Sequence, residues 1–198
     1  MRLPPPDECP EDEAVYSLVR QLFFAGATHQ RERVLFVAPG PQTRIRPLCE
    51  QVGKVLSEMS QASVAVMHSC PSLGPELAGK KNRQGRNSDP VLNTSAQIAE
   101  RLWRIPASMF AEIRFNVAQI KAALPFDHVL FSSVVYDSLT PLFCRACDGA
   151  VLVLTANKTR REPALRAMEI LRLCGSQVLG SVLDGRQYPV PESIYSRL

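Results

Sequence analysis

Hydrophobic and polar residues alternate along the chain in two patterns. Short, mostly apolar runs are typical of strands covered on both faces, and they lie at 34–37, 64–67, 102–105, 129–131, 150–154 and 178–183. Between the runs, apolar residues recur at spacings of three and four, as on one face of a helix, over 15–23, 48–59, 110–124, 139–147 and 165–171. Strands that alternate with helices pair in parallel through right-handed crossovers. The pattern therefore predicts an α/β fold, with a doubly wound, mostly parallel sheet and helices on both faces.

The last helical stretch has a clear apolar face and a clear end. Leu165, Met168 and Leu171 are expected to face the sheet, charged residues stand between them, and Gly175 is expected to end the helix. In folds of this kind, ligands bind beyond the carboxyl ends of the strands. The loops in which to look for a site are those after Val37, Met67, Phe131, Leu154 and Leu183.

Length and composition favour a single domain. The 198 residues divide into a segment at 1–12 that is expected to be disordered, an α/β domain at 13–185 with a long basic loop at 69–95, and a tail at 186–198. Hydrophobic residues make up 45% of the chain, yet no apolar run reaches the roughly 20 residues that span a bilayer. Because the chain starts without a secretory signal, we expect a soluble cytoplasmic protein whose six cysteines are thiols. The net charge of +4 gives no reason to expect nucleic-acid binding.

The first apolar run leads into a loop that starts like a phosphate-binding loop. Such a loop needs glycines whose backbone N–H groups converge on phosphate, a lysine that spans two phosphates and a hydroxyl residue that holds Mg²⁺. The residues found here are Gly40, Pro41, Gln42, Thr43, Arg44, Ile45 and Arg46. Two interpretations stay open at this point: a Pro-rich connection without a ligand, and a weak anion or nucleotide site in which an arginine binds phosphate.

Several segments of the chain resemble one protein family. They are "EAVYSLVRQLFF" at 13–24, "FDHVLFSSVV" at 126–135, "DGAVLVL" at 148–154, and the stretch 159–185. These segments are similar to the bacterial tyrosine kinases of capsule and exopolysaccharide synthesis, a branch of the P-loop ATPases that includes MinD and ParA. The resemblance implies a P-loop NTPase-like, Rossmann-like three-layer sandwich. It implies ATP and Mg²⁺ as cofactors only where the catalytic residues of the family are present.

Departures from the family pattern fall on the residues that carry its chemistry. In the phosphate loop, Arg44 stands on the family's glycine, Ile45 on its lysine and Arg46 on its hydroxyl residue. The two acidic motifs are replaced by His68, Cys70 and Ser132, and the asparagine beside the adenine is replaced by Asp184. The loss of one stabilising group costs on the order of 10²- to 10³-fold in rate. The resemblance therefore implies a degenerate member of the family, without catalytic residues.

Other candidate residues lie outside these motifs. The long loop carries cations that either face an anionic partner or are simply solvated, namely Lys80, Lys81, Arg83 and Arg86. Tyr188 and Tyr195 in the tail are candidate phosphorylation sites. Cys144 and Cys147 form a CxxC, for which two buried structural thiols and an iron–sulfur site are the alternatives. The three histidines show no zinc-ligand spacing, so we expect no metal site.

An intact fold pattern combined with absent catalytic residues favours one hypothesis about function. We expect a non-catalytic homologue that needs no cofactor and acts as a regulator or scaffold in exopolysaccharide (capsule) biosynthesis and export. Its expected partner is a protein of that machinery at the inner face of the membrane. Two alternatives stay open. One is an active ATP-binding kinase or ATPase with an arginine-containing phosphate loop and Mg²⁺; the other is an iron–sulfur carrier that uses the CxxC.

Overall fold

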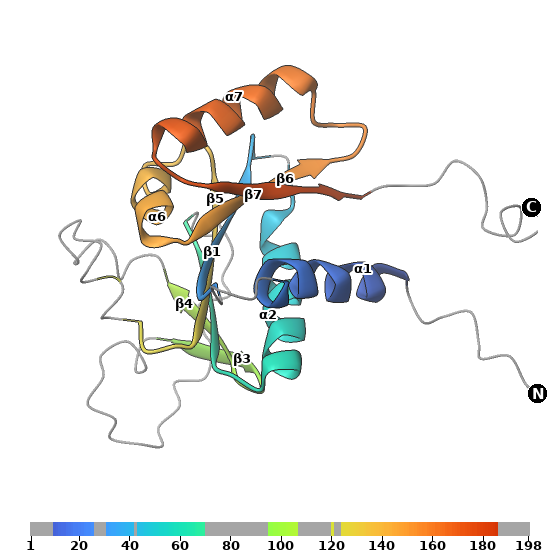
Figure 1. Cartoon of the computed structure of the whole chain (residues 1–198), viewed down its shortest axis with the longest axis vertical. Coiled ribbons are helices and arrows are strands. Elements are labelled where there is room, and N and C mark those ends of the chain that lie inside the picture. Colours follow the sequence, from blue (N-terminus) through green and yellow to red (C-terminus); the bar gives the residue numbers. More distant parts are fainter. Residues whose placement is uncertain are drawn as a thin grey trace, which may run out of the picture.

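The structure is a computed structural model that describes residues 10–25, 31–41, 43–69, 95–106, 120 and 124–185. Within these ranges, a seven-stranded sheet has the order β3-β4-β2-β5-β1-β6-β7 (Figure 1). The strands are β1 (Arg33–Ala38), β2 (Val64–His68), β3 (Ala96–Ala99), β4 (Leu102–Pro106), β5 (His128–Val134), β6 (Gly149–Thr155) and β7 (Val178–Asp184). Neighbouring strands are parallel except for β3 and β4. The mostly parallel sheet expected from the sequence is confirmed.

The sequence pattern does not predict β3. This strand has four residues, none of them fully buried, and it pairs antiparallel with β4 at the edge of the sheet. The chain turns between the two strands at Arg101, whose φ of 55° lies in the left-handed region. Four half-exposed residues carry no clear apolar period, so only the pairing with β4 reveals the strand.

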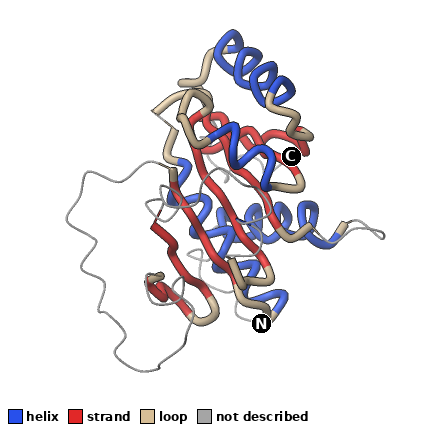
Figure 2. Tube along the Cα trace, turned by 90° about the vertical axis from the view of Figure 1, so that its left-hand side faces the viewer, coloured by secondary structure: helices blue, strands red, loops and turns tan. Residues whose placement is uncertain are grey.

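Helices cover both faces of the sheet (Figure 2). They are α1 (Pro10–Val19), which continues as the π-helical segment η1 (Arg20–Phe24), α2 (Ile45–Ser60), α6 (Thr140–Ala146) and α7 (Arg161–Leu173). α1, η1 and α2 pack on one face, and α6 and α7 pack on the other. The doubly wound α/β architecture is therefore confirmed. No helix among the described residues has both the length and the apolar character needed to cross a membrane.

The start of α1 corrects one sequence prediction. Pro10 begins this helix within the segment 1–12, which we expected to be disordered. A proline fits the first helical turn because its fixed φ suits the helix and its missing N–H would have no helical partner there. The first helix thus begins at Pro10, inside the segment 1–12.

Each face of the sheet has its own apolar cluster. Phe36 points to the side of α1 and α2, where it packs with Leu56. Phe131 points to the opposite side and packs against Phe143 of α6, with ring centroids 4.8 Å apart. Ile120 is fully buried in this second cluster. The sheet is thus covered by apolar side chains on both faces, as continuous apolar strands require.

α7 meets the sheet through a different stripe from the one expected. Leu165 is 48% exposed, whereas Ala167 and Leu171 are fully buried. Ala164 and Ala167 lie on the packed side of the helix, where small side chains allow close approach. The prediction that Leu165 faces the sheet is therefore wrong, and that for Leu171 is confirmed. Met168 is half-buried.

The carboxyl ends of five parallel strands lie at one edge of the sheet. The register pairs Ala38 with Val134, His68 with Ser132, and Thr155 with Asp184. The connections that follow β1, β2, β5, β6 and β7 therefore gather at this edge, which is where ligands bind in sheets of this type.

Candidate functional site

The loop after β1 turns its backbone N–H groups toward its own carbonyls. The N–H of Ile45 donates to the carbonyl of Thr43 at 2.9 Å, and the N–H of Thr43 donates to that of Gly40 at 3.4 Å. Arg44, between them, has φ −79° and ψ 67°, the conformation of an inverse γ-turn. Pro41 has no N–H to offer. Two of the amide groups that a phosphate-binding loop would present to an anion are thus engaged inside the loop.

The side chains at the three altered positions of this loop point to different places. Ile45, on the family's lysine position, packs against the apolar cluster beneath α1 and α2. Arg46 lies one position further on and donates from Nε to Oε1 of Glu50 at 3.2 Å. Arg44 is exposed and precedes the first turn of α2. Arg44 is therefore the altered residue whose charge faces solvent.

Glu50 on α2 is the centre of a polar cluster that includes His68 at the end of β2 and Arg104 in the middle of β4. Its Oε1 atom accepts from Nη2 of Arg104 at 2.7 Å, from Nε of Arg104 at 3.0 Å, from Arg46 at 3.2 Å and from Nε2 of His68 at 3.3 Å. The hydrogen bond from His68 and the two arginines outweigh desolvation and lower the pKa of Glu50 to about 2. Glu50 is therefore ionised and its charge is balanced inside the protein.

His68 and Ser132 are brought together by the register of β2 and β5. Nδ1 of His68 lies 2.5 Å from Oγ of Ser132. Burial lowers the pKa of His68, although the contact with Glu50 acts in the opposite direction. A neutral imidazole that donates from Nε2 to Glu50 accepts at Nδ1, so the Ser132 hydroxyl is the donor. His68 and Ser132, two of the three residues at the altered acidic positions, thus form hydrogen bonds within the protein.

A second cluster of hydroxyl groups joins the connections after β2 and β5. Ser69 Oγ donates to Ser133 Oγ at 2.9 Å, and Ser133 lies 2.6 Å from Oγ1 of Thr140. Thr140 in turn donates to the carbonyl of Val134 at 2.8 Å. These residues are buried, so the cluster holds the start of α6 against the end of β5.

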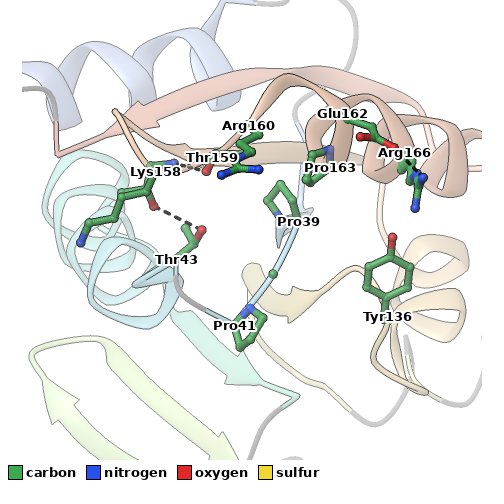
Figure 3. A pocket seen from close by; sticks show the side chains of 12 residues that line it. Pro39, Pro41, Thr43, Tyr136, Lys158, Thr159, Arg160, Glu162, Pro163 and Arg166 are labelled. Carbon is green, nitrogen blue, oxygen red and sulfur yellow. Dashed lines mark hydrogen bonds and ion pairs between the residues drawn. The ribbon is translucent and has the colours of Figure 1, made fainter.

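A cavity of about 450 Å³ opens between the loop after β1 and the turn from β6 into α7 (Figure 3). Its apolar wall includes Pro39, Pro41 and the ring of Tyr136. Its polar side includes Lys158 and Arg160, which the sequence analysis did not single out. The signal that points to them is their position in the connection after Leu154, which the fold pattern places at the ligand-binding edge.

Asp184 occupies the end of β7 and does not line this cavity. Its backbone carbonyl accepts from the N–H of Ala156 at 2.8 Å, which fixes the turn after β6 beside it. The other predicted site residues lie outside the described residues; they are Gln42, Cys70, Lys80, Lys81, Arg83, Arg86, Tyr188 and Tyr195.

The two cysteines of the CxxC differ in their surroundings. Cys144 on α6 is buried, whereas Cys147, which follows the last turn, is only half-buried, so the expectation of two buried thiols holds for one of them. Burial and the neighbouring Cys174 raise the pKa of Cys144 to about 12. Metal ligation requires the thiolate, which so high a pKa disfavours. The described part of the chain has no group of three or more His, Cys, Asp or Glu that could hold a metal ion.

The sequence is similar to that of one curated bacterial tyrosine kinase over part of its length. No family model matches the sequence. The tyrosine-protein kinase YwqD of Bacillus subtilis (strain 168) is 27% identical over 84 residues, which cover 41% of this chain and 35% of that protein. The match thus spans about a third of the length of this curated relative.

Solved structures of the same fold are more complete matches. The kinase domain of the Escherichia coli tyrosine kinase ETK has a TM-score of 0.65 at 15% identity, over 91% of this chain and 79% of that one. MinD from Aquifex aeolicus, solved in a MinC:MinD complex, has a TM-score of 0.59 at 15% identity, over 84% of this chain and 72% of that one. The chain has the α/β fold of the P-loop NTPases related to MinD and to plasmid partition proteins. Its similarity to the bacterial tyrosine kinases, first indicated by its sequence segments, is confirmed by these kinase matches.

Proposed function

We propose that this protein is a non-catalytic relative of the bacterial tyrosine kinases that acts as a regulator or scaffold in exopolysaccharide (capsule) biosynthesis and export. One observation carries the proposal: the side chains at the positions of phosphoryl-transfer chemistry are engaged with the protein itself. Ile45 is half-buried and packs against the apolar cluster, Arg46 is held by Glu50, and Ser132 is held by His68. None of the three offers the oxygen ligand that Mg²⁺ prefers together with a free position around it.

The electrostatics of the site support the same proposal. In phosphoryl transfer, catalysis comes almost entirely from positioning and from charge stabilisation by the metal ion and a lysine. In this protein the nearby carboxylate, Glu50, is neutralised by Arg46 and Arg104. A carboxylate that already holds two guanidinium groups is a poor partner for a divalent cation. The proposal therefore needs neither ATP nor Mg²⁺ as a cofactor.

The expected partner is a protein. A fold that keeps its sheet and both helical layers keeps surfaces through which a homologue can bind another protein, even after its chemistry is lost. We propose a component of the polysaccharide synthesis or export machinery, or an active kinase of that system, at the inner face of the membrane. Nucleic acid is not proposed as a partner, since the net charge is modest.

The test of the proposal is to measure ATP binding and turnover with Mg²⁺. We expect no submillimolar affinity in calorimetry, and no phosphate release or tyrosine phosphorylation above that of a blank without protein. Arg44→Ala is the informative variant, because Arg44 is exposed in the altered loop and is the residue that an arginine-based phosphate site would use. Submillimolar binding with turnover that Arg44→Ala abolishes would overturn the proposal and favour the active kinase.

A genetic measurement tests the scaffold role separately. Deleting the gene should lower the amount of exported polymer, and both the natural chain and Arg44→Ala should restore it equally. Restoration by the natural chain alone would show that the role requires Arg44 and would contradict the expectation that the altered loop is dispensable.

A further inference from the structure

The cavity beside the altered loop carries basic side chains that no carboxylate neutralises. Within the described ranges, neither Lys158 nor Arg160 forms an ion pair, although both line the cavity. Figure 3 shows the ammonium group of Lys158 directed away from the cavity, so Arg160 is the unpaired cation that faces it. A third cation, Arg166, is held by Glu162 at 2.6 Å, and both side chains of that pair are largely exposed. The charge balance of the lining is therefore positive, which favours an anionic ligand.

Hydroxyl groups and the start of a helix also line the cavity. Thr159 Oγ1 accepts from the backbone N–H of Thr155 at 2.8 Å, which leaves its own proton available as a donor. Thr43, which accepts from the Thr155 hydroxyl at 3.2 Å, also lines the cavity. The first turn of α7 contributes Glu162 and Pro163 to the wall, so the positive end of this helix faces the same space. The cavity thus combines cations, hydroxyl donors and a helix start, the groups that bind phosphate in proteins.

Part of the wall consists of apolar rings. Figure 3 shows the ring of Tyr136 across the cavity from Arg160, and Pro39 and Pro41 line the loop below Arg160. Tyr136 is 66% exposed, so its ring is available at the rim and is not part of the core. Proline and tyrosine rings offer flat apolar contact at a small entropic cost. A ligand that fills the cavity therefore has a flat apolar part next to its anionic group.

We propose that this cavity binds a phosphomonoester dianion carried on a flat apolar group, the chemistry of a phosphorylated tyrosine side chain in a protein partner. Its volume of about 450 Å³ lies within the usual range of small-ligand pockets. A triphosphate is disfavoured, because the amide groups of Thr43 and Ile45 donate inside the loop. The inference goes beyond the proposed function and does not depend on it, since it rests on the cavity alone.

Calorimetry on the full chain with phenyl phosphate and with inorganic phosphate tests the inference. We expect phenyl phosphate to bind more tightly than inorganic phosphate. Arg160→Gln should weaken the binding of both by at least about tenfold, the usual size of a charge-assisted hydrogen bond. Arg160 makes no side-chain cap to α7, so the substitution removes no helix-capping contact.

Arg161→Gln is the matched control, because it removes the same charge from the next residue, which does not line the cavity. It should leave the affinity for phenyl phosphate within about twofold of the natural chain, since exposed charges outside a site contribute little. Equal losses in the two variants, or no loss in either, would contradict the proposal by showing non-specific attraction to a basic surface or binding elsewhere.

Tyr136→Ala tests the apolar half of the site. The variant should weaken phenyl phosphate binding and leave inorganic phosphate binding unchanged. Because the side chain of Tyr136 is exposed, its truncation should leave the fold intact. A peptide with phosphotyrosine should then compete with phenyl phosphate, while the same peptide without phosphate should not. The inference is overturned if phenyl phosphate binds no better than inorganic phosphate, or if AMP or ATP binds more tightly with the same dependence on Arg160. None of these binding experiments measures turnover, so a result that overturns the phosphate-binding inference is distinguishable from one that overturns the non-catalytic proposal.

Discussion

Glu50 accepts hydrogen bonds from three residues that come from separate parts of the sequence. Arg46 is four residues away on the same helix, whereas His68 ends β2 and Arg104 lies in β4. Arg46, His68 and Ser132 can each be identified from the sequence, because each stands on a family motif. Glu50 and Arg104 cannot, because their contact depends on the position of α2 over the sheet and no local pattern encodes it.

The cluster around Glu50 predicts an asymmetry between two glutamates. Glu50→Gln leaves Arg46 and Arg104 half-buried without a carboxylate, so the free energy of unfolding should fall by about 1–3 kcal/mol. Glu162→Gln breaks an exposed ion pair with Arg166, so the free energy of unfolding should change by about 0.5 kcal/mol or less. Urea unfolding of both variants at neutral pH measures the difference. Equal effects would show that the Glu50 cluster does not contribute to stability.

At the scale of the element, the end of α7 is encoded locally. Gly175 follows the helix with φ 77°, a conformation that costs any residue with a Cβ atom. The N–H of Gly175 donates to the carbonyl of Arg172 at 2.9 Å, and that of Ser176 donates to Leu171 at 3.0 Å, which is the Schellman arrangement. The predicted end of the helix at Gly175 is therefore confirmed. The face that α7 turns to the sheet was predicted less well, because leucine at 165 and alanine at 164 both fit an apolar stripe.

The glycine at this helix end supports a second stability prediction. Gly175→Ala should lower the free energy of unfolding by about 1 kcal/mol or slightly more, because alanine is strained at positive φ. Gly180→Ala in β7 is the control, since Gly180 has no positive φ and no atom within 4 Å of the added Cβ. It should change stability by about 0.5 kcal/mol or less. Thermal unfolding that shifts equally in both variants would contradict the role of Gly175.

At the scale of the whole molecule, two apolar layers hold one sheet. The side that carries α6 and α7 also includes Ile120 and Leu124, which come from the stretch 110–124 that the sequence predicts to be helical. Of this stretch, the structure describes Ile120 and Leu124, and both are buried. Their burial is as expected for the apolar face of that stretch.

Ile120 is therefore expected to contribute strongly to the stability of the whole domain. Ile120→Ala should lower the free energy of unfolding by about 2–5 kcal/mol, because it removes a fully buried side chain and leaves a cavity. Leu173→Ala is the control, as Leu173 is 81% exposed and its truncation should cost about 0.5 kcal/mol or less. Chemical denaturation followed by circular dichroism compares the two. A small effect of Ile120→Ala would mean that Ile120 is not packed in the apolar cluster on this face of the sheet.

The sequence by itself determined the succession of helices and strands along the chain, except for β3, and the absence of the lysine and acidic residues on the family motifs. Periodicity and residue identity are local properties, so they can be read without the fold. Only the tertiary structure decided that Glu50 meets Arg104, that His68 meets Ser132, and that Arg160 shares a cavity with Tyr136. These contacts join segments that are distant along the chain, and they follow from strand register and helix placement, which depend on the packing of the whole sheet.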